Sequence, residues 1–105
     1  MREGTASSTA RGVAAHRLHY DRVPAPYGNP AADETLTRDV AAGLDRPPGT
    51  PMHERLRVRT AFFDRVVVTS IDQGITQVVI GGAGYDGRAY RYAKPGVRWL
   101  SLIHI

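Results

Sequence analysis

Stretches of periodic apolar residues, separated by breaks, predict a series of helices followed by two short strands. The periodic stretches place apolar residues about one turn apart, which is typical of amphipathic helices packed on a larger body. Prolines and glycines between these stretches exclude a helix or a central strand there. The expected helices cover residues 8–21, 31–44, 52–71 and 86–92, the breaks lie at 23–30, 45–51 and 95–96, and the strands cover 75–80 and 97–99.

The spacing of the apolar residues also predicts which helix faces are buried. The expected buried stripes are Val13, Ala14 and Leu18 in the first helix, Leu36, Val40 and Leu44 in the second, and Leu56, Phe63, Val67 and Ile71, widened by Phe62 and Val66, in the third. Asp64, Arg57 and Arg65 are expected away from the third stripe. Gly74 is expected to end the third helix in a left-handed conformation.

One stretch of the chain combines a buried strand, a glycine turn and the start of a helix. Val78–Ile80 is β-branched without polar alternation, which suits a parallel strand covered on both faces. Gly81, Gly82 and Gly84 then lack Cβ atoms where the chain turns, so another group can approach the backbone. Asp86 is a suitable N-cap for the helix that follows. Such a turn presents backbone N–H groups at the carboxyl end of a strand, where open α/β sheets bind ligands.

The glycine turn by itself allows more than one interpretation. Gly82, Gly84 and Gly87 fit the dinucleotide fingerprint G-x-G-x-x-G, which would indicate an NAD(P)-binding Rossmann-type protein. A glycine-rich turn without any ligand fits the same spacing. A non-enzymatic helical interaction module is a third alternative, although it leaves the turn without an explanation.

Composition narrows the class of protein. The chain has 105 residues, enough for one small domain, and it has no cysteine, which excludes disulfides and thiolate metal sites. The 14 basic and 10 acidic residues form no basic stripe with interleaved aromatics, so nucleic-acid binding is not expected. No apolar stretch approaches the ~20 residues that span a bilayer, and no signal-peptide segment is recognisable at residues 1–20. We therefore expect a cytoplasmic protein without a metal, and its oligomeric state stays open.

The residues around the glycine turn resemble a known family. Residues 77–91, Q-V-V-I-G-G-A-G-Y-D-G-R-A-Y-R, resemble the first motif of the leucine carboxyl methyltransferase-like family of class I S-adenosylmethionine-dependent methyltransferases. Bacterial members of that family typically read Q-V-V-I-L-G-A-G-L-D-T-R-A-Y-R-L, a match far more specific than a glycine spacing. Gly81 stands where the family has leucine, Gly87 where it has threonine, and Asn29 where it has aspartate before a proline.

The resemblance extends from about Thr5 to Trp99 and implies an α/β fold. N-terminal helices would precede the first β-α-β unit of a truncated Rossmann-like class I methyltransferase fold, so that residues 1–99 form the N-terminal part of a single methyltransferase domain. The family transfers a methyl group from S-adenosyl-L-methionine to an acceptor, often a carboxylate or another oxygen. Because two strands form a marginal sheet, we expect the 105-residue chain alone to be inactive and poorly folded. Catalytic residues and the acceptor stay unnamed.

The resemblance also implies cofactor-binding residues. The family's Arg-Thr pair, followed by two apolar residues and Asp, matches the segment that begins at Arg59, and in the family this arginine binds the cofactor carboxylate. A guanidinium group suits that task because it can donate two hydrogen bonds to one carboxylate. Arg11 matches a basic residue of the N-terminal helix with the same role. Gly82, Ala83 and Gly84 would pack their backbone against the cofactor. Without the resemblance, both arginines read as surface residues of helices.

The last six residues, 100–105, depart from the family pattern. Leu-Ser-Leu-Ile-His-Ile is the translation of a transposon-end adapter used in some sequencing libraries, so we expect a non-native tail. The family ends its second strand with an acid that binds the ribose hydroxyls of the cofactor, and no acid follows Trp99 here. The alternative is a natural apolar strand.

Overall fold

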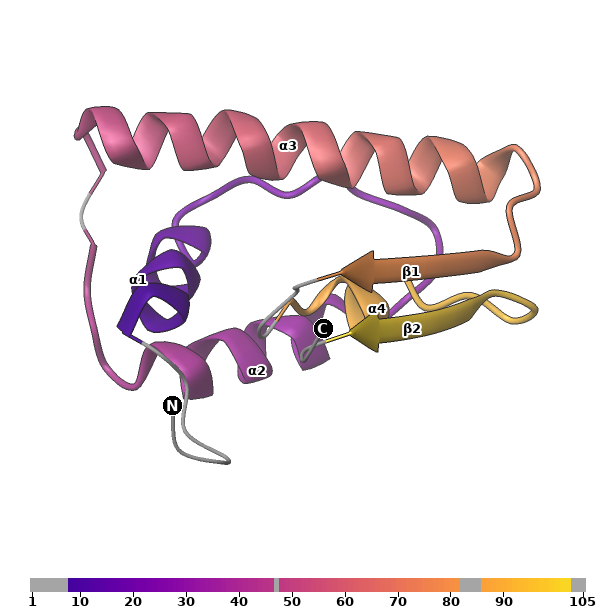
Figure 1. The fold of residues 1–105 in the computed structure, drawn as a ribbon, viewed down its shortest axis with the longest axis horizontal. Helices are drawn as coiled ribbons and strands as arrows, with labels where there is room; N and C mark the ends of the chain where they lie inside the picture. Colours follow the sequence, from indigo (N-terminus) through magenta and orange to yellow (C-terminus); the bar gives the residue numbers. More distant parts are fainter. Residues whose placement is uncertain (1–7, 47, 82–85, 103–105) are drawn as a thin grey trace.

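The chain folds as a group of helices leading into a parallel pair of strands (Figure 1). The computed structural model describes residues 8–46, 48–81 and 86–102. Its elements are α1 (Ser8–Arg17), α2 (Pro30–Ala41), α3 (Pro51–Asp72), β1 (Gln77–Gly81), α4 (Arg88–Arg91) and β2 (Arg98–Leu102). The order of elements agrees with the sequence prediction, although α1 ends at Arg17 and not near residue 21. This mixture of helices and a parallel sheet is consistent with a truncated α/β fold.

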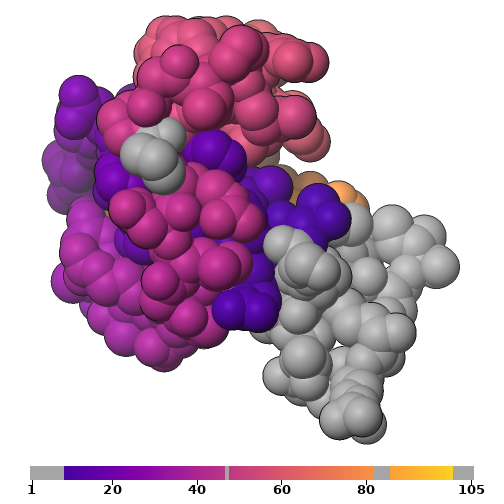
Figure 2. All heavy atoms as spheres, turned by 90° about the vertical axis from the view of Figure 1, so that its left-hand side faces the viewer, coloured from indigo at the N-terminus to yellow at the C-terminus, as the bar shows by residue number. Residues whose placement is uncertain are grey.

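The apolar core lies between α1 and α2. Its buried residues are Ala14 and Ala15 of α1 and Val40 and Ala41 of α2. Leu36 and Leu44 pack against this cluster, so the predicted inner face of α2 is confirmed. In Figure 2, α1 (indigo) lies between α2 (magenta) and α3 (pink). Alanine side chains on both helices allow α1 and α2 to approach closely.

The starts of both long helices follow from capping residues. Asn29 Oδ1 accepts a hydrogen bond from the backbone of Ala32 at 3.1 Å, and Thr50 Oγ1 accepts one from the backbone of His53 at 3.0 Å. Proline is the first residue of each helix, where its missing N–H costs nothing. Asn29 therefore caps α2 without the charge that an aspartate would bring. At the other end of α3, Gly74 has a φ of +100°, as predicted.

The two strands form a parallel sheet within the described part of the chain. The register pairs Gln77 with Arg98, Val78 with Trp99, Val79 with Leu100, Ile80 with Ser101 and Gly81 with Leu102. The expected cover on both faces of β1 is absent here, because Val79 is 52% exposed while Val78 and Ile80 are half-buried. β2 continues to Leu102, into the segment expected to be a tail.

The buried face of α3 is largely polar, and the prediction of an apolar buried stripe is wrong for most of its members. The buried residues are His53, Thr60, Asp64 and Ile71. Phe62, Phe63 and Val66, which were expected inside, are exposed, whereas Asp64 has no exposed surface. The physical reason is that Asp64 neutralises two buried arginines, so the face that carries it turns inward.

Asp64 connects three parts of the chain through ion pairs. Nε and Nη2 of Arg22, in the linker before α2, donate to its carboxylate oxygens at 2.8 and 2.9 Å. Nε of Arg88, at the start of α4, donates to Oδ1 at 2.8 Å. Burial by itself would raise the pKa of Asp64, but the two guanidinium groups outweigh it and lower that pKa below its usual value. Asp64 is therefore held in its charged form.

A second buried carboxylate, that of Asp33 on α2, holds α4 from the other side. It pairs with Nε of Arg91 and, at 3.2 Å, with Nη1 of Arg22. Thr37 Oγ1 donates a further hydrogen bond to Asp33 Oδ1 at 3.2 Å. Gly87 lies so close that a Cβ atom there would be 1.7 Å from the same oxygen. Only glycine at position 87 leaves room for this carboxylate.

His16 of α1 and His53 of α3 join these two helices. Their Nδ1 atoms are 2.8 Å apart, both rings are buried, and the hydroxyl of Tyr20 donates to the backbone carbonyl of His53 at 2.8 Å. In this hydrogen bond one Nδ1 donates its N–H and the other accepts, so at least one of the two rings has to be neutral. Burial lowers the pKa of His16, and positive charge on His53, Arg46 and His19 acts in the same direction.

Acid should therefore weaken the contact between α1 and α3. Below about pH 6.5, His16 binds a proton in the unfolded chain but stays neutral in the folded protein. As the pH falls further, the free energy of unfolding should therefore decrease until the pH reaches the lowered pKa of the folded state. Urea midpoints at about pH 7.5 and about pH 5.5 measure this loss. In His16→Gln the difference between the two midpoints should shrink, and an undiminished difference would rule out His16 as its source.

Candidate functional site

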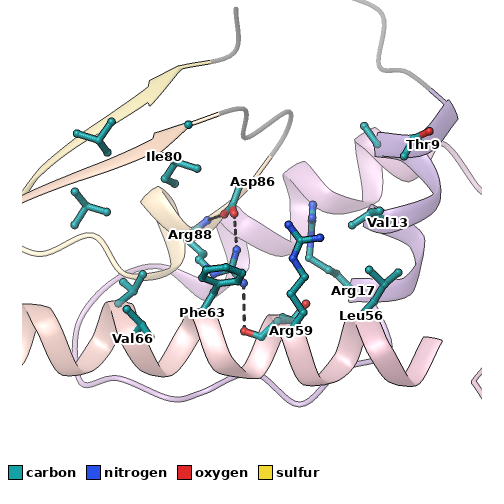
Figure 3. A pocket seen from close by; sticks show the side chains of 16 residues that line it. Thr9, Val13, Arg17, Leu56, Arg59, Phe63, Val66, Ile80, Asp86 and Arg88 are labelled. Carbon is teal, nitrogen blue, oxygen red and sulfur yellow. Dashed lines mark hydrogen bonds and ion pairs between the residues drawn. The ribbon is translucent and has the colours of Figure 1, made fainter. Parts of the chain in front are cut away.

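A cavity of about 670 Å³ lies between α1, α3 and β1 (Figure 3). This volume is in the range of sites for small molecules and cofactors. The outward apolar stripe of α3 forms one wall through Leu56, Phe63, Val66 and Val67, and β1 forms the opposite wall. Four side chains of the predicted buried stripe therefore line a cavity, whereas Phe62 and Ile71 do not.

The cavity extends to the carboxyl end of β1. Val78–Gly81 line it before the glycine turn, and Asp86 lines it after the turn. Gly82, Ala83 and Gly84, the predicted backbone contacts for a cofactor, lie outside the described residues. Both flanks of the turn thus border the cavity, at the edge of the sheet where α/β proteins bind ligands.

Arg59 lines this cavity from α3. Its side chain is exposed, and within residues 8–46, 48–81 and 86–102 it forms no ion pair with a carboxylate. Its guanidinium carbon lies 5.8 Å from the centre of the Phe63 ring. Figure 3 shows Arg59 and Arg17 pointing into the same space. Arg59 is therefore placed to receive an anionic group of a ligand.

Arg11, the other predicted carboxylate-binding residue, is not among the residues that line the cavity. Its Nε is buried and has no hydrogen-bond partner in the described part of the chain. Arg17, further along α1, lines the cavity. Burial lowers the pKa of Arg17, and the nearby carboxylate of Asp86 opposes that shift. Arg17 could not be predicted from the sequence, because nothing in the spacing of α1 distinguishes it from other surface arginines.

Arg88 also reaches the cavity wall, but carboxylates already neutralise it. Its Nη1 pairs with Asp86, its Nε with Asp64, and its Nη2 donates to the carbonyl of Thr60 at 3.2 Å. Asp86 Oδ1 in turn accepts a hydrogen bond from the backbone of Arg88 at 2.8 Å. Gly87, and not Asp86, is the N-cap of α4, so the predicted N-cap position is wrong by one residue. Arg88 is thus a fixed part of the wall, whereas Arg59 has its donors available.

Gly87 is explained by packing and not by a dinucleotide. In the fingerprint G-x-G-x-x-G, the third glycine allows a helix to pack closely on a strand. In this structure the space above Gly87 is taken by the Asp33 carboxylate of α2, whose Oδ1 would lie 1.7 Å from an added Cβ. The third glycine of the fingerprint is therefore accounted for without a bound cofactor.

Two further classes of site have no support in the described part of the chain. No helix there is long and apolar enough to cross a membrane. No group of three or more His, Cys, Asp or Glu residues there could hold a metal ion.

Comparison with known proteins assigns the family. The family described as Leucine carboxyl methyltransferase matches residues 4–102. The chain belongs to this family. The resemblance read from residues 77–91 is thereby confirmed, and the match includes every helix and strand that borders the cavity.

Curated relatives match most of this chain but are much longer. One from Mycolicibacterium vanbaalenii is 38% identical over an aligned length of 105 residues. The alignment covers 84% of this chain and 34% of that protein. One from Mycobacterium marinum is 34% identical over an aligned length of 101 residues, which covers 84% of this chain and 34% of that protein. One from Frankia alni is 35% identical over 97 residues, which covers 87% of this chain and 31% of that protein. All three are named as S-adenosyl-L-methionine-dependent methyltransferases. The chain thus spans about a third of their length. No solved structure matches the chain significantly.

Proposed function

We propose that this chain is the N-terminal, cofactor-binding part of an S-adenosyl-L-methionine-dependent methyltransferase. The observation that carries the proposal is the position of Arg59, which lines a cavity at the carboxyl end of β1 and has no carboxylate partner among the described residues. Membership of the family and the names of the relatives support the same reaction class. Residues 1–99 would supply the helices and first strands of one methyltransferase domain.

In this proposal the chain's own residues bind and orient the cofactor. Arg59, with Arg11 as the second candidate, would hold the carboxylate, and Gly82, Ala83 and Gly84 would pack their backbone against the cofactor. S-adenosyl-L-methionine supplies a methyl group on a sulfonium, which is ready for in-line transfer. The main task of the surrounding protein is then alignment of donor and acceptor.

The acceptor in this proposal is an oxygen, with a carboxylate as one candidate, because the family commonly methylates such groups. The segments that would contact the acceptor follow the cofactor-binding part in the family. The 105-residue chain by itself, with its two described strands, should therefore transfer no methyl group, and methyl transfer by the purified chain would show this part of the proposal to be wrong.

Replacing Arg59 with alanine should weaken binding of S-adenosyl-L-methionine about ten- to hundred-fold, because hydrogen bonds to a charged group contribute about 1.5–3 kcal/mol. Calorimetric titration of the full-length gene product measures the dissociation constant. Decarboxylated S-adenosylmethionine, which differs only by the missing carboxylate, should bind equally to wild type and variant. The matched control is Arg65→Ala, an exposed arginine of the same helix that does not line the cavity.

The same titration separates the proposal from the dinucleotide alternative. Binding of NAD in place of S-adenosyl-L-methionine would assign the turn at Gly82, Gly84 and Gly87 to a Rossmann-type dinucleotide site. If Arg59→Ala instead weakens binding of S-adenosyl-L-methionine and of its decarboxylated form equally, S-adenosyl-L-methionine is supported as the cofactor. That result would also show that Arg59 does not bind its carboxylate.

A further inference from the structure

The Phe63 side chain lies between two guanidinium groups at the cavity wall. The guanidinium carbon of Arg59 is 5.8 Å from the centre of its ring, and that of Arg88 is 5.9 Å away. Both distances are within the ~6 Å at which a cation is attracted to an aromatic ring. Figure 3 shows the ring in the cavity between Arg59 and Arg88. Phe63 therefore contacts one arginine that is already neutralised and one that is not.

The contact with Arg88 fixes the ring on one side. Arg88 is 9% exposed and is held by Asp64, Asp86 and the carbonyl of Thr60. A guanidinium group with this many acceptors has little freedom to move. The ring of Phe63 therefore packs against a rigid neighbour, although 43% of its surface is exposed.

The contact with Arg59 has the opposite character. In the part of the chain that the structure describes, the Arg59 guanidinium has no hydrogen-bond or ion-pair partner. Its contact there is with the face of the Phe63 ring. The two residues are four apart on α3, a spacing at which helix side chains meet. An exposed arginine loses side-chain entropy when it binds a ligand, and a contact that already restricts it reduces that loss.

We propose that Phe63 is a positioning residue that holds the Arg59 guanidinium toward the carboxylate of the cofactor. This inference rests on the proposed function, because it concerns the same carboxylate. Phe63 acts through Arg59, so its removal should affect only ligands that carry the carboxylate. A ring that merely formed the cavity wall would affect every ligand of the cavity alike.

The test uses Phe63→Leu in the full-length gene product, titrated with S-adenosyl-L-methionine and with its decarboxylated form. The dissociation constant of S-adenosyl-L-methionine should rise about two- to five-fold, the range expected for a cation–aromatic contact at an exposed site. That of the decarboxylated form should not change. Phe63→Tyr keeps the aromatic face and should restore tight binding. Val58→Ala is the control, because Val58 is an exposed apolar residue of α3 that does not line the cavity. Phe62 is unsuitable as a control, since its ring packs edge-on against that of Phe63 with the ring centres 5.5 Å apart.

Each outcome decides the inference. Equal weakening of both ligands, or an equal effect in Val58→Ala, would overturn it. A double variant Arg59→Ala, Phe63→Leu that binds S-adenosyl-L-methionine more weakly than Arg59→Ala alone would also overturn the inference. A residue that acts through Arg59 has no effect once Arg59 is gone. Failure of the wild type to bind S-adenosyl-L-methionine would refute the proposed function. In that case the NMR shift of the Arg59 Nε–H still tests the ring contact, since it should change in Phe63→Leu and stay the same in Val58→Ala.

Discussion

Replacing Asp64 with alanine should lower the free energy of unfolding by about 3–5 kcal/mol, the usual cost of removing one partner of a buried ion pair. Asp64 is fully buried and is the acceptor for both Arg22 and Arg88. Without it, two guanidinium groups stay buried with fewer acceptors than they need. Because folded domains are stable by only about 5–15 kcal/mol, the loss should be visible as a large fall in the urea midpoint of the full-length gene product.

A control and a second variant keep this expectation specific. Asp39→Ala removes an exposed aspartate of α2 that has no ion-pair partner in the described residues, so it should leave the midpoint nearly unchanged. Asp64→Asn keeps the size of the side chain and loses only the charge, so it should be nearly as harmful as Asp64→Ala. A mild effect of both Asp64 variants would mean that Arg22 and Arg88 find other partners.

Replacing Gly87 with alanine should be about as harmful, with a loss of about 3 kcal/mol or more. The added Cβ would lie 1.7 Å from Asp33 Oδ1 and 2.6 Å from its Cγ. Asp33 cannot move aside freely, since its carboxylate is bound by Arg91, Arg22 and Thr37. The clash must therefore break these bonds or displace α4. Thermal or urea unfolding measures the loss.

The double variant Asp33→Ala, Gly87→Ala distinguishes this clash from an ordinary backbone effect. With the carboxylate gone, alanine at position 87 meets no obstacle from it, so the double variant should be as stable as Asp33→Ala alone. Gly81→Ala is the matched glycine control, because a Cβ there meets nothing within 4 Å. If the two single losses add in the double variant, the contact between Asp33 and Gly87 is not their common cause.

These contacts also give a reason for Gly87, which stands where the sequences that residues 77–91 resemble have threonine. In this chain the carboxylate of Asp33 on α2 occupies the space that a side chain at position 87 would need. A side chain at position 87 and a carboxylate at position 33 exclude each other in this arrangement.

The sequence predicted the order of elements and the family, because both depend on local patterns. Helix periodicity, the prolines and the motif at residues 77–91 can all be read without knowing which segments touch. The inner face of α2 followed from Leu36, Val40 and Leu44 for the same reason, since these residues lie on an apolar face with an ordinary apolar neighbour.

The inner face of α3 could not be read in this way. A charged residue such as Asp64 is normally exposed to solvent. Asp64 is buried here because Arg22 and Arg88 pair with its carboxylate. These partners lie far away in the sequence, so no local pattern reveals them. The same limit applies to Arg17, which lines the cavity because α1 packs beside α3.

The distribution of the buried ion pairs along the chain bears on the timing of folding during synthesis. Asp33 and Asp64 share Arg22, which is made early, but their other partners are Arg88 and Arg91. A nascent chain that has been synthesised only as far as the end of α3 therefore contains both carboxylates but only one of their arginine partners, Arg22. N-terminal segments can begin to fold while translation continues. For this chain the helices can close on one another with balanced charge only after the ribosome has passed the glycine turn and released α4.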